Sequence, residues 1–292
     1  MIREYLKQKQ KIIDDTLRLL FEGKSPASRT LYDAMRYSLL AGGKRIRPAL
    51  FLLLLEILGK DSSRFLPEAC ALECVHTYSL IHDDLPGMDN DDYRRGKLTN
   101  HKVFGTGVAI MAGDALLTAA FEILSRSRTV SCENKCRMIE VLASAAGANG
   151  MVAGQVQDIE AENKELTLEE LRFMDYCKTG CLLCAPVDMA AILGEASPQE
   201  KKNLHAFGKH LGLLFQITDD LLDENGHLDE MGKAPGKDRE ENKSTYVTIL
   251  GKEKATALAA EEAAKARESL CLPGRDISLL YELIDFILHR TA

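Results

Sequence analysis

Apolar residues recur along this chain at the three- and four-residue spacings that place them on one face of a helix. Leu6, Ile13 and Leu17 share such a face near the start, and residues 23–26, which include glycine and proline, end that predicted helix. We find no convincing run of alternating polar and apolar residues that would indicate strands. The pattern therefore predicts an all-α protein.

Further helices are predicted from the same spacing and from their boundary signals. Two of them begin at capping boxes, Thr167 to Glu170 and Ser197 to Glu200. The predicted ranges are 28–40, 48–58, 65–84, 103–125, 134–160, 167–193, 198–223, 239–269 and 277–289. Residues 225–237, which contain glycines and Pro235, are predicted to form a mobile loop. Because no linker, repeat or low-complexity segment separates these helices, we expect one domain, residues 1–292, built as a single large bundle of about ten helices.

The composition is that of a soluble protein with a sizeable core: 46% of the 292 residues are hydrophobic and 28% are charged. The formal net charge of −7 argues against nucleic acid or an anionic membrane surface as a partner. The longest apolar run, Ala49 to Leu55, is far shorter than the roughly 18 residues of a membrane span, so none is expected. Any anionic ligand must therefore be held by local basic clusters or through metal ions.

The eight cysteines lie mostly in i, i+4 pairs on predicted helices, a spacing that suits reduced, partly buried thiols. Cys181 and Cys184 form a lone C-x-x-C with no second pair or histidine at zinc-finger spacing, so we expect no zinc site there. The polar start, residues 1–11, does not have the pattern of a signal peptide. We expect a cytoplasmic protein.

Acidic residues are concentrated between His82 and Arg95, directly after an apolar predicted helix. This stretch holds Asp83, Asp84, Asp89, Asp91 and Asp92, and then Arg94 and Arg95. Such a cluster repels itself unless a cation lies within it, which favours hard divalent ions and magnesium above all. The alternative is a solvated acidic loop, which is what most runs of charge are.

A second acidic cluster, Asp219, Asp220 and Asp223, follows the apolar run 211–217. On a helix, Asp219 and Asp223 lie one turn apart on the same face and can share a cation. One such pair often marks only an exposed helix end. Two clusters at helix C-termini are more informative, because the helix dipole disfavours carboxylates there and a positive partner is needed.

Together these motifs resemble those of the trans-isoprenyl diphosphate synthases. His82 to Arg95 is similar to the first aspartate-rich motif of the family, and Phe215 to Asp223 is similar to the second. The other family elements occur in order: Gly42 to Pro48, His76, Gly154-Gln155 with Asp158, Lys178 to Gly180, Lys233, and Lys243 to Tyr246. Each is common by itself, but the ordered set is specific. The resemblance implies an all-α bundle of the isoprenoid synthase type around a central cavity, a homodimer, and joining of isopentenyl diphosphate to an allylic diphosphate.

The resemblance also implies which residues hold the allylic diphosphate. Three magnesium ions would be bound by Asp83, Asp84, Asp89, Asp219 and Asp223. Arg94, Lys178 and Lys233 would complete the shell around the anion, with Lys243 in support. Thr179, Gln216 and the carbonyl group of Lys178 would face the allylic cation.

Isopentenyl diphosphate must not ionise, so its site should hold the diphosphate without metal, in a basic pocket. Lys44, Arg47, His76 and Arg95 match the positions at which the family binds it. Taken singly, the first two could be surface charges at a helix start, and His76 could be a satisfied helical histidine. In the order of the family, we expect them to form one pocket.

Product length should depend on the side chains below the first aspartates. Tyr78 precedes Asp83 by five residues, a little over one helical turn, where its phenol would block a growing tail. Together with the insertion Pro86-Gly87, this resembles bacterial farnesyl diphosphate synthases. We expect farnesyl diphosphate from dimethylallyl and geranyl diphosphates, with geranylgeranyl or geranyl diphosphate synthase as alternatives. A class I terpene cyclase would not need the basic pocket, and a non-catalytic partner subunit typically lacks one aspartate motif.

Overall fold

The computed structural model describes residues 1–22, 28–161, 164–225 and 243–289. The α-helices in these ranges are α1 (Ile2–Leu20), α2 (Arg29–Leu39), α3 (Ile46–Ile57), α4 (Leu66–Asp83), α5 (Asn100–Phe104), α6 (Thr106–Arg126), α7 (Cys132–Ala146), α8 (Met151–Ala161), α9 (Leu168–Asp175), α10 (Cys181–Leu193), α11 (Pro198–Asn225), α14 (Tyr246–Leu250), α15 (Lys252–Ser269) and α16 (Ser278–Leu288). A 3-10 turn, η2 (Ser62–Phe65), precedes α4, and a π-helical turn, η3 (Tyr176–Gly180), joins α9 to α10. The predicted all-α class is confirmed.

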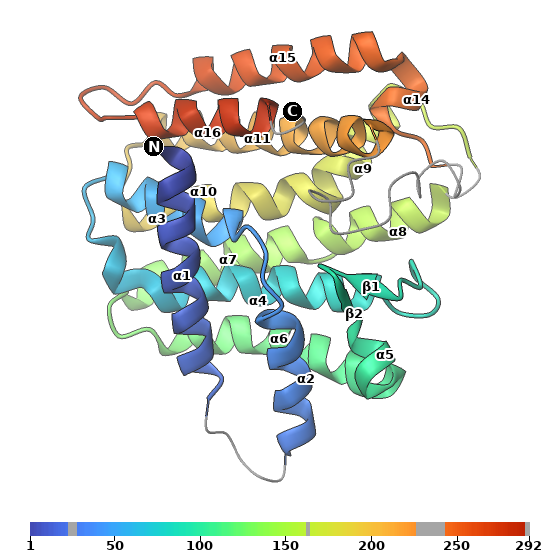
Figure 1. Cartoon of the computed structure of the whole chain (residues 1–292). Coiled ribbons are helices and arrows are strands. Elements are labelled where there is room, and N and C mark those ends of the chain that lie inside the picture. Colours follow the sequence, from blue (N-terminus) through green and yellow to red (C-terminus); the bar gives the residue numbers. More distant parts are fainter. Residues whose placement is uncertain (23–27, 162–163, 226–242, 290–292) are drawn as a thin grey trace.

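The long helices lie in stacked layers. In Figure 1, α4, α6, α10, α11 and α15 run in roughly one direction, and α1 and α2 cross them. One apolar core extends through these layers from Ile2 of α1 to Ile287 of α16. A continuous core is what the expected single domain, residues 1–292, would have, and that assignment stays a prediction.

The helices α3 and α10 are apolar on nearly all sides, as helices enclosed by other helices must be. Residues 49–55 of α3 are all buried, which explains the longest apolar run of the sequence. The segments Thr106–Arg126 and Leu168–Leu193 are long and apolar enough to cross a membrane by length and composition alone. The most apolar window of Leu168–Leu193 is 72% buried, so the apolar character of this segment is explained by its place in the core. The most apolar window of α6 is only 33% buried.

Three predicted helices are each two helices in the structure, and the breaks fall at glycines. The range 103–125 divides at Gly105 (φ 84°), and the described part of 239–269 divides at Gly251 (φ 80°). The range 134–160 divides between α7 and α8, where Gly147 has the extended backbone of a helix end. The apolar spacing continues across each break, which is why periodicity alone did not reveal it. The capping boxes at Thr167 and Ser197 are confirmed.

The expectation of no strands was wrong in one place. Tyr93–Arg94 (β1) and Lys97–Leu98 (β2) form an antiparallel hairpin directly after the first acidic cluster. Each strand has two residues, too few for an alternating pattern to be visible. Most of the predicted loop 225–237, the predicted stop at 23–26 and the start of the range 239–269 lie outside the described residues.

Glycines let three backbones approach closely around η3. A Cβ atom on Gly154 of α8 would lie 2.2 Å from the backbone nitrogen of Lys178, and one on Gly212 of α11 would lie 2.9 Å from Cα of Gly180. The π-helical turn is thus held between α8 and α11 by backbone contact. Such turns widen a helix locally and re-aim its side chains. Here the re-aimed side chains are Lys178 and Thr179.

Candidate active site

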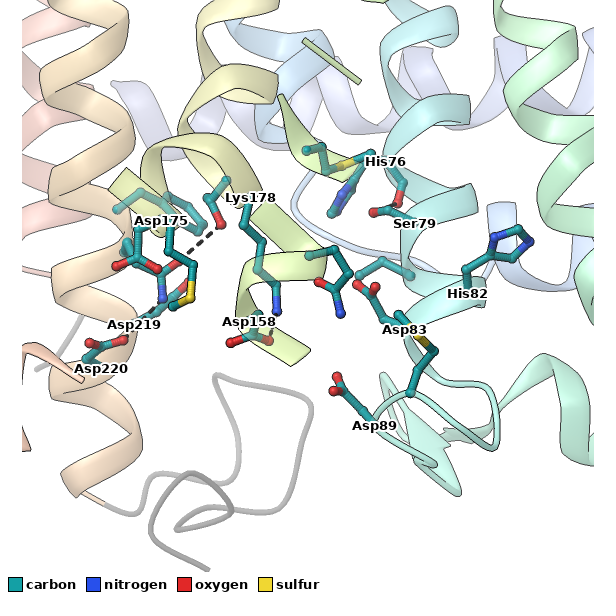
Figure 2. A pocket seen from close by; sticks show the side chains of 18 of the residues that line it. His76, Ser79, His82, Asp83, Asp89, Asp158, Asp175, Lys178, Asp219 and Asp220 are labelled. Carbon is teal, nitrogen blue, oxygen red and sulfur yellow. Dashed lines mark hydrogen bonds and ion pairs between the residues drawn. The ribbon is translucent and has the colours of Figure 1, made fainter. Parts of the chain in front are cut away.

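A cavity of about 1100 Å³ lies between α4, α8, η3 and α11. Nearly all of the predicted site residues in the described ranges line it, including both substrate sets and four of the five predicted metal ligands, on opposite walls. Figure 2 shows Asp83 and Asp89 on one side, Asp219 and Asp220 on the other, and Lys178 with Asp158 between them. Residues far apart in the chain therefore share one chamber.

The first acidic wall is built by a backbone turn at the end of α4. The backbone nitrogen of Asp89 donates to the carbonyl oxygen of Asp83 at 2.9 Å, so the four residues between Asp84 and Asp89 fold back on the helix end. Gly87 permits this return with a left-handed φ of 106°. The insertion thereby places the carboxylates of Asp83 and Asp89 along the same side of the cavity.

These carboxylates suit a metal that is shared with an anionic ligand. Asp219 and Asp223 line the opposite wall, one turn apart on α11. Within the described residues, no three His, Cys, Asp or Glu side chains are grouped closely enough to hold an ion by themselves. Magnesium ordinarily takes one or two carboxylates together with water and ligand phosphates. The donor set fits that mode of binding better than a metal site closed by protein alone.

Asp84 differs from its neighbour Asp83. It is 3% exposed and is not among the residues that line the large cavity. Its Oδ1 accepts from Nε of Arg94 at 2.6 Å and lies 2.5 Å from Nη2 of the same guanidinium. Burial would lower the pKa of Arg94, but the bond to Asp84 and the nearby aspartates outweigh it and raise that pKa. A metal-binding role for Asp84 stays a prediction, and the geometry makes it the partner that orients Arg94.

Lysine side chains lie beside the carboxylates of the cavity. Nζ of Lys178 donates to Oδ2 of Asp158 at 2.6 Å, and Nζ of Lys243 lies 3.7 Å from Oδ1 of Asp89. Burial would lower the pKa of Lys178, but Asp158 and then Asp83 raise it on balance, so the ammonium stays charged. The predicted partner Lys233 lies outside the described residues.

A hydrogen-bonded chain orients the polar groups at the centre of the cavity. The hydroxyl of Thr179 donates to Oε1 of Gln216 at 3.1 Å, and Nε2 of Gln216 donates to Oδ1 of Asp220 at 3.1 Å. The other oxygen of Asp220 accepts from the backbone nitrogen of Tyr246 at 2.9 Å. Asp220 thus ties α11 to the segment that carries Lys243. Sequence reasoning assigned no role to Asp220 or Asp158, and only their places within the motifs could have indicated one.

The four residues predicted to hold a metal-free diphosphate, Lys44, Arg47, His76 and Arg95, all line the same cavity. Nε of Arg47 is buried and has no hydrogen-bond partner among the described residues. Burial lowers the pKa of Arg47 to about 10, against the opposing effects of Glu73 and Asp219. Burial and the neighbouring arginines, Arg47 first, also lower the pKa of His76, so the imidazole is neutral. A partly desolvated cluster of this kind gains from binding an anion.

Tyr78 lines the cavity and is 6% exposed. Its ring stands edge-to-face with the imidazole of His82, with centroids 5.5 Å apart. Nε2 of His82 lies 3.0 Å from the carbonyl oxygen of Ile110, and a Cβ atom on Gly113 would lie 2.2 Å from that Nε2. The glycine on α6 therefore leaves room for His82, and His82 limits where the phenol can lie. Burial raises the pKa of Tyr78 to about 12, with Asp83 and Asp114 adding to the effect.

Comparison with known proteins identifies relatives of this chain. Residues 28–271 match the family model described as polyprenyl synthetase. The chain is 45% identical over 289 residues to the farnesyl diphosphate synthase of Geobacillus stearothermophilus, covering 97% of each chain. It is 46% identical over 263 residues to a geranylgeranyl pyrophosphate synthase of Capsicum annuum, covering 89% of this chain and 71% of that protein. The crystal structure of an FPP/GFPP synthase from Zymomonas mobilis superposes with a TM-score of 0.88 at 33% identity, covering 98% of both chains.

The different settings of Asp83 and Asp84 predict different effects of the same substitution. Asp84→Asn should lower the free energy of unfolding by about 3 kcal/mol, because it leaves the largely buried Arg94 without its main counter-charge. Asp83→Asn should lower it little, because that carboxylate belongs to a self-repelling wall. Urea unfolding of both variants in the presence of a chelator measures the contrast. Equal losses for the two would contradict the role given to Asp84.

Proposed function

Because this chain belongs to the polyprenyl synthetase family, we propose that it is a magnesium-dependent trans-prenyltransferase that condenses isopentenyl diphosphate with dimethylallyl and then geranyl diphosphate to give farnesyl diphosphate. One observation carries the proposal: a single cavity holds a carboxylate-lined wall and a separate basic pocket. Two diphosphates, one destined to ionise and one not, need these two environments. Relatives that are named farnesyl diphosphate synthase, and that align with nearly the whole chain, support the proposal.

The allylic diphosphate is proposed to bind between the acidic walls. Asp83, Asp89, Asp219 and Asp223 would hold the three magnesium ions that the family resemblance implies. The metal would supply the positive charge that makes diphosphate a leaving group. Arg94, Lys178 and Lys243 add positive charge at the same end of the cavity. Lys178 is already beside Asp158, so its ammonium is positioned before the anion arrives.

After the carbon–oxygen bond of the allylic substrate breaks, the cation must be kept from water until the new bond forms. The hydroxyl oxygen of Thr179 and the amide oxygen of Gln216 lie together and can face the positive carbon. Isopentenyl diphosphate, held by Lys44, Arg47, His76 and Arg95, then presents its double bond to that carbon. The adduct loses a proton, for which the released diphosphate is the base, because His76 lies in the other substrate's pocket.

Two other functions are less well supported. A class I terpene cyclase uses one diphosphate and has no need of the second, basic set, which this cavity contains. A non-catalytic partner subunit would not be expected to keep both aspartate clusters on facing walls, as this chain does.

The proposed reaction is tested by incubating the pure protein with magnesium, isopentenyl diphosphate and each allylic diphosphate in turn. We expect dimethylallyl and geranyl diphosphates to be extended to farnesyl diphosphate, identified by mass spectrometry. A chelator should abolish turnover, because the diphosphate then lacks charge neutralisation. Failure to extend any allylic primer would overturn the proposal, and a cyclic hydrocarbon product would favour the cyclase.

Product length is proposed to depend on Tyr78. Identity does not decide it, since the farnesyl and geranylgeranyl relatives are about equally similar to this chain. Tyr78 lines the cavity on α4, one turn before Asp83, and His82 restricts the position of its ring. A phenol held in this way can act as a floor that stops a tail of fifteen carbons.

Tyr78→Ala should shift the products towards geranylgeranyl diphosphate and longer chains, because it removes the ring from the cavity wall. Tyr78→Phe is the matched control, since it keeps the ring and loses only the hydroxyl, and its products should remain those of the unchanged protein. Chromatography of the dephosphorylated alcohols measures the distribution. If the alanine variant still stops at farnesyl, the floor lies elsewhere.

We also propose a homodimer joined through α6. This helix is apolar yet its most apolar window is only 33% buried, and Met111 on it is 53% exposed. Exposed apolar faces of this kind mark interaction sites.

The enzyme is proposed to be cytoplasmic, because the apolar segment Leu168–Leu193 is buried in the core and the eight cysteines are free thiols. Recovery of the protein in the membrane fraction would contradict this.

Met111→Glu should convert the dimer to a monomer, because a carboxylate would be buried in the interface without a partner. Phe173→Glu on α9 is the control, since Phe173 is similarly exposed, at 57%, on a different helix. Light scattering coupled to size-exclusion chromatography reports the mass of each. A monomeric unchanged protein, or a dimeric Met111→Glu variant, would contradict the assignment of α6.

A further inference from the structure

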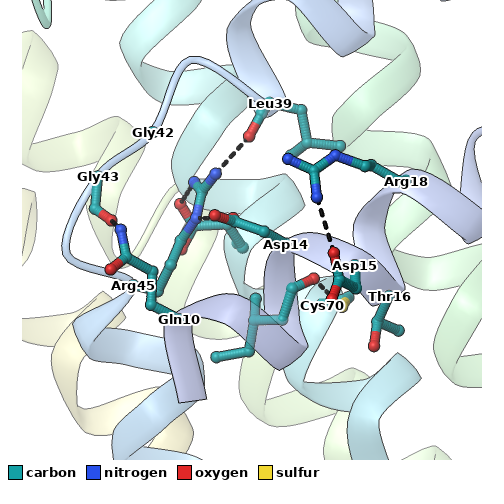
Figure 3. A network of polar contacts seen from close by, with 12 residues as sticks. Gln10, Asp14, Asp15, Thr16, Arg18, Leu39, Gly42, Gly43, Arg45 and Cys70 are labelled. Atoms are coloured by element: carbon teal, nitrogen blue, oxygen red, sulfur yellow. Dashed lines mark hydrogen bonds and ion pairs between the residues drawn. The ribbon is translucent and has the colours of Figure 1, made fainter. Parts of the chain in front are cut away.

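The N-terminal helix α1 reaches the loop that carries two residues of the basic pocket. This helix precedes residue 28, where the match to the family model begins. Figure 3 shows that its polar side faces the segment from Gly42 to Arg45. Nε2 of Gln10 donates to the carbonyl oxygen of Gly43 at 2.7 Å, and Oδ1 of Asp14 accepts from Nε of Arg45 at 2.8 Å.

Arg45 is the centre of this contact. Its side chain is fully buried and donates to Oε1 of Glu73 on α4 at 2.5 Å and to the carbonyl oxygen of Leu39 at 2.6 Å, besides Asp14. Its backbone has a left-handed φ of 49°, a conformation that is unfavourable for a residue other than glycine. The three hydrogen-bonding directions therefore hold the loop in a conformation that it would not adopt freely.

The conformation of Arg45 decides where its neighbours point. Lys44 and Arg47 lie on either side of it in the chain and line the cavity, whereas the guanidinium of Arg45 is fully buried on its own protein partners. Arg95 donates to the carbonyl oxygen of Gly42, and a Cβ atom on Gly43 would lie 2.6 Å from its guanidinium carbon. Three of the four basic groups thus depend on the same loop.

Resting on the proposed function, we propose that Gln10 and Asp14 of α1 are positioning residues for isopentenyl diphosphate. They act through Gly43 and Arg45, holding the loop so that Lys44, Arg47 and Arg95 converge on a diphosphate that carries no metal. Neither residue touches the cavity, so neither is catalytic. The allylic site on α4, η3 and α11 makes no use of them.

The test compares Asp14→Leu with Asp15→Leu. Asp15 is the matched control, because it adjoins Asp14 on α1 but is exposed and forms an ion pair with the exposed Arg18. Binding of isopentenyl diphosphate is measured by calorimetry in a chelator, which isolates the metal-free site. A non-hydrolysable thio analogue of geranyl diphosphate with magnesium reports on the other site.

We expect Asp14→Leu to weaken isopentenyl diphosphate binding about tenfold, the loss of roughly one charge-assisted hydrogen bond. Asp14→Asn, which keeps an acceptor, should recover part of the loss, and Asp15→Leu should bind like the unchanged protein. The analogue should bind all variants equally. In turnover, the KM for isopentenyl diphosphate should rise while kcat is retained.

Equal binding of isopentenyl diphosphate by Asp14→Leu and the unchanged protein would overturn the inference and leave the proposed function standing. So would an equal loss for both substrates, because that is a general structural effect. If Asp14→Leu does not fold, Gln10→Ala decides the question by the same measurements. If the unchanged protein binds no isopentenyl diphosphate in the chelator, the metal-free site and the inference both fail.

Discussion

Like charges held close together at the edge of a low-dielectric interior are the constraint on which this structure depends. Asp83 and Asp89 face Asp219 and Asp223 across one cavity, and each wall alone would repel itself. Lys178 and Arg94 reduce that repulsion through their charge interaction with Asp83, and Lys243 does so beside Asp89. The negative potential that remains is what would draw in metal, and with it an anionic substrate.

A cluster of positively charged residues lines another part of the same cavity. Arg47, Arg95 and His76 are gathered in a partly desolvated pocket, where Arg47 retains a buried nitrogen without a partner among the described residues. Arg45, in contrast, has its charge matched by Asp14 and Glu73. Arg45 is thus a structural arginine, whereas Arg47 keeps a buried donor that a bound anion could use.

Backbone geometry determines where these polar and charged side chains lie. The π-helical turn η3 is held by close contacts at Gly154 and Gly212, which put Lys178 and Thr179 at the cavity. The return of Asp89 onto the end of α4 brings two carboxylates to one wall. Each feature depends on the absence of a Cβ atom or on a left-handed φ, so the same side chains on regular helices would point elsewhere.

The sequence by itself determined the all-α class, the main helix boundaries marked by capping boxes, and the two aspartate clusters with their basic partners. Apolar spacing and motif order depend only on the order of residues along the chain, so they can be recognised without the structure. Only the tertiary structure decided that Asp84 turns away from the cavity to Arg94, that Asp220 holds Gln216, and that α1 reaches the loop around Arg45. Periodicity could not reveal the breaks at Gly105 and Gly251, or the turn at η3, because a change of backbone direction leaves the apolar spacing intact. Adjacent aspartates are equivalent in a sequence, and they differ here only because folding pairs Asp84 with the guanidinium of Arg94.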